Sequence, residues 1–195
     1  MTTLTKCRID KKFCFSWLLR HGAVKENLSM DDNGFVPMSE IISKLNKKSK
    51  SKVVTVDDIT DIVANCPKQR FKIEIIGGTT QIRANQGHSM KQTMSIELEA
   101  IQKFSERVFH GTSKSAWQII EEKGLSRMTR NHIHMALESG LEKHRIRSQL
   151  FIEIDANKAL EDGIKFFKSD NGVILSPGDQ NGILHPKYFK SVHNF

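Results

Sequence analysis

The sequence has few cysteines and no long apolar run. Its three cysteines, Cys7, Cys14 and Cys66, form no CxxC pair. Their number and spacing argue against a disulfide framework or a cysteine zinc site and fit a reduced intracellular protein. No apolar run reaches membrane-spanning length, and the polar start "MTTLTKCRIDKK" does not resemble a signal peptide. We therefore expect an intracellular protein, cytoplasmic, nuclear or both, with no membrane contact.

Several motifs of well-known enzyme classes are also missing. The chain has no Walker loop, no GxGxxG and no HExxH, and no Ser-His-Asp set follows from its spacing. It has no internal repeats and no low-complexity segment. A catalytic function has to be argued from other residues, and the basic and imidazole side chains are the most abundant candidates.

Acidic residues are too few to balance the basic ones in the first half of the chain. Residues 1–91 hold 16 Lys and Arg against 9 Asp and Glu, a net charge of +7, whereas residues 92–195 hold 14 against 13. A basic half favours a polyanionic partner, most often a nucleic acid. The run "NKKSKSK" at 46–52 is equally compatible with a solvated lysine-rich surface.

The pattern of the first half predicts small helices followed by a hairpin. Helices are expected at about 9–21, 39–46 and 55–65, with Ser39 and Thr55 as N-caps and Asp58 completing a capping box. A short extended piece is expected at 35–36. The alternating "RFKIEII" and "TTQIRAN" on either side of Gly77-Gly78 predict a β-hairpin. This content is that of a winged-helix domain, although content alone does not prove the topology.

The second half is predicted to be rich in strands. Strands are expected in "RVFHG", "HIHMA" and "SQLFIEID", a hairpin in "IKFFKSDNGVILSP", and helices in "SKSAWQIIEEKG", which Gly124 ends, and "NKALEDG". The polar stretch before it, partly helical, should connect the halves. We therefore expect an α+β protein with a first lobe at 1–90, a connection at 91–105 and a second lobe at 106–195.

Three short motifs carry candidate chemistry, and two of them leave alternatives open. In "LLRHGAV", Arg20 and His21 could complement a helix C-terminus, with Gly22 as a left-handed cap, or they could form an anion site. His132 and His134 in "RNHIHMA" would share one strand face, as metal ligands, as hydrogen-bonded imidazoles or as donors lining a ligand pocket. In "FHGT", a glycine and a following helix N-terminus would suit a phosphate.

Taken in order, the segments resemble one enzyme family. "LLRHGAVKENLSMDDNGFVPMSEI", "TVDDITDIVANCPKQRFKI", "IRANQGHS", "VFHGTSKSAWQIIEEKGLSRMTRNHIHMA" and "NGVILSPG" look like the tRNA 2′-phosphotransferases, the NAD-dependent enzymes of tRNA splicing. The likeness runs from about residue 16 to residue 188. It implies a winged-helix lobe and a lobe with the ADP-ribosyltransferase fold, a split β-sheet, with the active site in the cleft between them. It also implies transfer of an internal RNA 2′-phosphate to NAD.

The resemblance assigns roles to individual residues. The family's essential Arg-His-Arg-Arg set falls on Arg20, His21, Arg70 and Arg130, with Lys68 as a neighbouring charge. The side that binds NAD, which is consumed as a co-substrate, falls on His110, Gly111, Thr112, His132, His134, Gln86 and Gly87. We expect no metal, a monomer, and tRNA or another RNA with an internal 2′-phosphate as partner. This family lacks the ribose-orienting glutamate of ADP-ribosyltransferase toxins, and no acid at a matching site is apparent here.

Two other functions remain compatible with these residues. The chain could be a nucleic-acid-binding module whose second lobe binds ADP-ribose or capped ends without turnover. It could also be a transferase that places ADP-ribose on RNA or DNA phosphate ends. A histidine beside three arginines favours the phosphotransferase, because a protein that only binds has less need of a group that moves protons.

Overall fold

The structure is a computed structural model that describes residues 15–48, 53–89, 98–143 and 148–194. The chain divides into two compact units, Met1–Glu97 and Leu98–Phe195. Each unit has a hydrophobic core of its own. The α+β class predicted from the sequence is confirmed. Within the described residues, no helix is long and apolar enough to cross a membrane.

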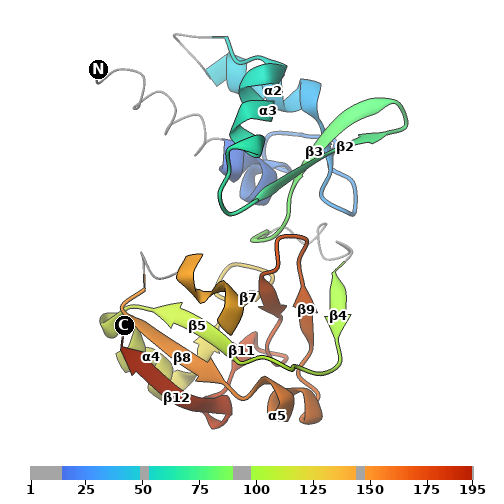
Figure 1. The fold of residues 1–195 in the computed structure, drawn as a ribbon. Coiled ribbons are helices and arrows are strands. Elements are labelled where there is room, and N and C mark those ends of the chain that lie inside the picture. Colours follow the sequence, from blue (N-terminus) through green and yellow to red (C-terminus); the bar gives the residue numbers. More distant parts are fainter. Residues whose placement is uncertain (1–14, 49–52, 90–97, 144–147, 195) are drawn as a thin grey trace. The chain divides into compact units, whose positions relative to one another are not determined.

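The first unit combines helices with a three-stranded antiparallel sheet (Figure 1). The elements are η1 (Leu18–Gly22), β1 (Val36–Pro37), α2 (Met38–Lys48), α3 (Val56–Ala64), β2 (Phe71–Ile76) and β3 (Thr79–Ala84). The strand order is β1-β3-β2, and the β2–β3 hairpin turns at Gly77-Gly78, where both glycines have positive φ. This confirms the predicted hairpin. The core of the first unit contains the buried side chains of Phe15, Leu19, Ile41, Ile59 and Ile82.

The helix starts of the first unit agree only in part with the sequence. Thr55 and Asp58 do form a capping box: the Thr55 side chain accepts from the Asp58 N–H, and the Asp58 carboxylate accepts from the Thr55 N–H. Ser39 is not an N-cap, because α2 begins at Met38. Strand β1 runs directly into this helix through Pro37, whose fixed φ and missing N–H suit a helix start.

Gly22 does not cap a helix in the left-handed conformation as expected. Residues 15–17 are α-helical, and Leu18–Gly22 continue as a turn of π-helix that runs on into Ala23 with helical φ and ψ. A glycine is needed for a different reason: a Cβ on Gly22 would lie 2.4 Å from the Trp17 ring. The earlier part of the expected helix, with Cys14, lies outside the described residues.

The second unit is built on an antiparallel sheet of seven strands (Figure 1). In sheet order the strands are β12 (Phe189–Asn194), β8 (Leu150–Ile154), β5 (Val108–Thr112), β7 (Ile133–Leu137), β10 (Ile174–Ser176), β9 (Phe166–Lys168) and β4 (Glu99–Ile101). The strands predicted from "RVFHG", "SQLFIEID" and the 164–177 hairpin are present. Strand β4 lies in the segment expected to connect the lobes, and it pairs with β9 rather than forming a helix.

Two short helices, a two-stranded ribbon and two 3-10 turns complete this unit. They are α4 (Lys114–Lys123), α5 (Ala156–Glu161), β6 (Leu125–Ser126) with β11 (Ile183–Leu184), η3 (Glu138–Lys143) and η5 (Pro186–Tyr188). Gly124 ends α4 with a φ of 85°, as predicted. Alternate residues of β8 face two sides: Ile152 and Ile154 join the main core, while Phe151 joins Phe109 in a smaller cluster.

The centre of the large sheet contains a short pairing. Strand β5 pairs with β8 along all five of its residues, but with β7 only through Val108 and Phe109. Beyond Phe109 the two strands part, and the residues that follow on β5 are His110, Gly111 and Thr112. The motif "FHGT" therefore lies where the sheet opens.

Candidate active site

In the first unit, three of the sequence motifs come together around Arg20. The Arg20 guanidinium lies over the Phe71 ring, with its Cζ atom 5.8 Å from the ring centroid. It also lies against Gly87, where a Cβ would be 3.5 Å from Nε. Gly87 has a φ of 89°, so glycine here allows both the backbone turn and the close approach. Residues of "LLRH", "KQRF" and "NQGHS" thus lie side by side in the first unit.

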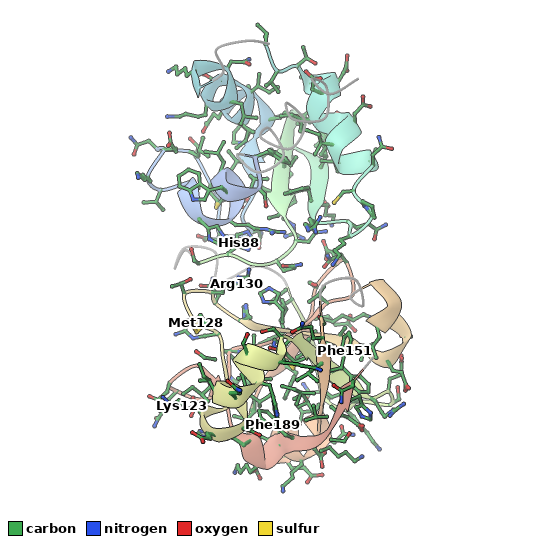
Figure 2. All side chains as sticks on the ribbon, turned by 90° about the vertical axis from the view of Figure 1, so that its left-hand side faces the viewer. His88, Lys123, Met128, Arg130, Phe151 and Phe189 are labelled. Carbon is green, nitrogen blue, oxygen red and sulfur yellow. The ribbon has the colours of Figure 1, made fainter. Side chains whose placement is uncertain are left out.

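Arg20 and His21 are each joined to the segment after β3 by one hydrogen bond. The His21 Nδ1 atom is 2.9 Å from the Ser89 hydroxyl oxygen, and the Ser89 N–H donates to the Arg20 carbonyl at 3.1 Å. The His21 side chain is exposed. His88, the residue before Ser89, is buried. Figure 2 labels it in the segment after β3. The imidazole of His21 is therefore oriented by Ser89.

Arg70 is held by the turn that leads into β2. Its carbonyl accepts from the Asn85 N–H at 2.9 Å, and the Asn85 side chain donates to the Gln69 carbonyl at 2.8 Å. The Arg70 Nη1 atom donates to the Cys66 sulfur at 3.6 Å. Burial raises the pKa of the Cys66 thiol, but hydrogen bonds and the charge of Arg70 outweigh burial and lower it overall. Lys68, in the same turn, is half-buried.

In the second unit, a histidine bridges the place where β5 and β7 part. The His110 Nδ1 atom lies 2.8 Å from the His134 carbonyl oxygen. A carbonyl can only accept, so Nδ1 carries the proton, and Nε2 of the neutral ring is an acceptor. Burial lowers the pKa of His110, and the bond to His134 opposes this only in part. At neutral pH His110 is therefore an uncharged imidazole.

His132 and His134 do not lie on one strand. Strand β7 starts at Ile133, so the expectation that both histidines share a strand face is wrong. His132 precedes the strand in the bend that ends the 127–132 loop, and its ring packs edge-on against Phe167 at 6.0 Å between centroids. Burial first, and then the charge of Arg127, lower the pKa of His132 to about 4.

Two backbone N–H groups at the α4 N-terminus already donate hydrogen bonds within the protein. The Lys114 N–H donates to the Gln149 side chain at 3.0 Å, and the Ala116 N–H donates to the Ser113 hydroxyl at 3.1 Å. The phosphate expected at this terminus would compete with those bonds. Gly111 is needed for packing, since a Cβ there would meet the Ser148 side chain. Thr112 is half-buried, and its carbonyl accepts from the Gln149 N–H.

Arg130 belongs to an exposed loop of the second unit, after β6. Figure 2 labels it together with Met128 on this loop. The Arg130 N–H donates to the Arg127 carbonyl at 3.0 Å and closes a turn. The first unit contains Arg20, His21 and Arg70. The second unit contains Arg130, together with His110, His132 and His134.

Comparison with known proteins gives the family. Residues 8–178 match the model of the family described as RNA 2′-phosphotransferase, Tpt1/KptA. The chain belongs to this family. It is an RNA 2′-phosphotransferase, a transferase by the activity that defines the family.

Three relatives illustrate the similarity. The chain is 43% identical to tRNA 2′-phosphotransferase 1 of Danio rerio over 188 residues, 89% of this chain and 80% of the relative. It is 40% identical to tRNA 2′-phosphotransferase 1 of Homo sapiens, over 91% of this chain and 72% of the relative. It is 36% identical to tRNA 2′-phosphotransferase of Saccharomyces cerevisiae, over 83% of this chain and 75% of the relative.

Sequence reasoning missed two side chains of this phosphotransferase that contact the candidate residues. Cys66 was counted only for its redox behaviour, yet its sulfur accepts from Arg70. Arg127 was given no role, yet its Nη1 atom donates to the Arg130 carbonyl at 2.8 Å. A spacing of three residues before Arg130 was the available signal for Arg127, because residues i and i+3 of a turn lie close together.

Proposed function

We propose that this RNA 2′-phosphotransferase moves the internal 2′-phosphate of spliced tRNA, or of another RNA, to NAD, which is consumed. The observation that carries this proposal is the meeting of Arg20, His21 and the 85–89 segment in the first unit. Several donors arranged on one rigid wall suit a 2′-phosphomonoester beside a 3′,5′-diester, which together carry close to three negative charges.

The reaction we propose has two displacement steps. In the first, an oxygen of the RNA 2′-phosphate attacks C1″ of the nicotinamide ribose, and nicotinamide leaves with the electrons of the glycosidic bond. In the second, the 2″-hydroxyl of that ribose attacks the phosphorus. The RNA 2′-oxygen leaves and takes up the proton that the 2″-hydroxyl loses. The products are RNA with a free 2′-hydroxyl, nicotinamide and ADP-ribose 1″,2″-cyclic phosphate.

The basic residues act on the phosphate in this scheme. Arg20, Arg70 and Arg130 would make charge-assisted hydrogen bonds to its oxygens, and Lys68 would add charge. Negative charge grows on these oxygens in the second step, where preorganised donors lower the barrier most. His21 would move the proton between the two hydroxyls, because imidazole titrates near neutral pH and Ser89 orients its ring.

The neutral histidines act on NAD in the same scheme. His110 is uncharged and presents Nε2 as an acceptor, so a ribose hydroxyl of NAD can donate to it. His132 is also neutral at pH 7. We assign the NAD side to His110, Gly111, Thr112, His132 and His134, with Gln86 and Gly87 contributing from the first unit.

We further propose a division of labour between the units. The first would act as a winged-helix RNA-binding unit, supported by its helices, its β2–β3 hairpin and the +7 charge of residues 1–91. The second would have the ADP-ribosyltransferase fold, supported by the parting of β5 and β7. We expect the protein to act as a monomer and without metal.

One experiment distinguishes this reaction from its alternatives. The protein is incubated with NAD and an RNA that carries one internal 2′-[³²P]phosphate, and nicotinamide release and loss of the label are followed separately. Equal amounts of both, with a cyclic phosphate product, are expected. Nicotinamide release with the label retained on RNA would indicate ADP-ribosylation without the second step. Binding with neither product would indicate a module that only binds. RNA without the 2′-phosphate is the matched control.

A further inference from the structure

The loop that carries Arg130 contains a strained turn. The Arg130 N–H donates to the Arg127 carbonyl at 3.0 Å, which closes the turn 127–130. Met128, which follows Arg127, has a φ of 54°. This value lies in the left-handed region, which residues other than glycine rarely adopt. Its N–H donates to the Ser126 hydroxyl at 3.0 Å. A backbone in this region persists only when surrounding contacts hold it.

The Arg127 side chain supplies one such contact. Its Nη1 atom donates to the carbonyl of Arg130 at 2.8 Å, so backbone and side chain of Arg127 both bind Arg130. The Arg127 N–H in turn donates to the Gly182 carbonyl at 2.9 Å. Arg127 therefore links the strained turn to the loop between β10 and β11.

That second loop is held by hydrogen bonds of its own and passes close to Arg127. The Asp179 carboxylate accepts from the N–H groups of Asn181 and Ile183 at 2.8 and 2.9 Å, and the Gly182 N–H donates to the Asp179 carbonyl at 2.9 Å. A Cβ on Gly182 would lie 2.3 Å from Nε of Arg127. The arginine side chain thus lies directly across the Gly182 backbone, where only glycine leaves room.

We propose that Arg127 is a positioning residue for 2′-phosphate transfer: braced on Gly182, it holds the 127–130 turn closed and so presents the Arg130 guanidinium to the phosphate. This rests on the proposed role of Arg130. Arginine suits the task because its planar fork reaches a carbonyl in a fixed geometry, whereas the lysine ammonium is a flexible point charge. A donor that is misplaced by about 1 Å can cost up to about a hundredfold in rate.

A competing role for Arg127 is direct contact with a phosphate of the RNA or of NAD. Both roles predict a slower Arg127→Ala enzyme, but they differ when Arg130 is already missing. If Arg127 acts through Arg130, its removal from an Arg130→Ala enzyme costs nothing more. If it binds substrate itself, the two losses multiply.

The test measures kcat and KM for Arg127→Ala, Arg127→Lys, Arg130→Ala and the Arg127→Ala/Arg130→Ala double variant. We expect Arg127→Ala to lower kcat about tenfold with a KM for RNA close to wild type, by the misplacement argument. Arg127→Lys should behave like Arg127→Ala, and the double variant should equal Arg130→Ala. A double variant slower than Arg130→Ala by the full Arg127 factor, or an unimpaired Arg127→Ala enzyme, would overturn the proposal. Full activity of Arg130→Ala would instead refute the proposed role of Arg130.

A second pair of variants displaces Arg127 without removing it. Gly182→Ala puts a methyl group where the arginine side chain lies, and we expect the same tenfold loss in kcat. Gly163→Ala is the matched control, because Gly163, like Gly182, has a positive φ, of 87°. No atom lies within 4 Å of the Cβ that would be added at Gly163. This variant carries the same backbone strain and should keep full activity. A folded Gly182→Ala enzyme with wild-type kcat would count against the proposal, and the Arg127 variants decide the question if Gly182→Ala does not fold.

Discussion

Replacement of His132 by glutamine should make the second unit less sensitive to acid. The pKa of His132 is about 4 in the folded protein and 6.5 in an unfolded chain. Between these values the unfolded state binds the extra proton, so the free energy of unfolding falls as the pH drops. Relative to pH 7.5, the loss at pH 4.5 is about 2.5 kcal/mol for this one group. His132→Gln removes that loss and keeps a neutral side chain.

The assay compares urea unfolding of the two proteins at pH 7.5 and pH 4.5. The chain has two tryptophans, one in each unit, so a Trp17→Phe background leaves Trp117 in α4 as the reporter of the second unit. Other groups titrate over this range in both proteins, and their contribution cancels in the difference. The lost contact between His132 and Phe167 is a constant offset. Equal pH dependence of the two proteins, or an NMR titration of His132 with a midpoint near 6.5, would refute the reasoning.

Three further predictions concern catalysis. Turnover should fall on the order of 100-fold in each of the variants Arg20→Ala, Arg70→Ala and His21→Ala, by analogy with loss of an oxyanion donor. The control is His144→Ala, outside the motifs, whose turnover should stay near wild type. Equal losses of turnover at His144 and His21 would remove the basis of the assignment. Treatment with EDTA should leave turnover unchanged, and restoration of a lost activity by zinc or magnesium would contradict metal independence. Neutralising the lysines of 46–52 together should weaken RNA binding and leave the affinity for NAD unchanged. The slope of log K for RNA against log salt concentration should fall by roughly one unit per lost phosphate contact. An unchanged slope would mean that the lysines only face solvent. That cluster is Lys47, Lys48, Lys50 and Lys52, of which the last two lie outside the described residues.

The sequence predicted the elements whose signals are local. The capping box at Thr55 and the glycine turn at Gly77-Gly78 were found because each depends on neighbouring residues. The strands β5, β7, β8, β9 and β10 of the second unit were also predicted, whereas β6, β11 and β12 were not. Strand β4 was missed because its three residues form a strand only by pairing with β9, which is more than sixty residues away.

The assignment of the candidate site residues comes from the resemblance and not from a local pattern. The likeness named Arg20, Arg70 and Arg130, whereas the local pattern at Gly22 left a left-handed helix cap and an anion site as alternatives. That cap failed because Trp17 and the continuing turn determine the backbone there. The three-residue spacing between Arg127 and Arg130 could not show where the Arg127 side chain lies, because it lies across Gly182, fifty-five residues later in the chain.

The π-turn at Leu18–Gly22 has a consequence for how this chain tolerates a change of length. A π-turn holds one more residue than the α-helical turn that it replaces, so loss of a single residue would restore regular i→i−4 bonding and is inexpensive for the backbone. The π-turn covers nearly the same rotation with that extra residue, so the residues on either side keep their positions around the helix axis when it is lost. Phe15 would stay in the core, and Arg20 would stay over Phe71 and beside Gly87. Successive residues of an α-helix are about 100° apart around its axis, so loss of a second residue would rotate Phe15 by about that angle relative to Arg20. We expect a one-residue deletion within this turn to give a protein that folds and turns over, and a two-residue deletion to abolish turnover.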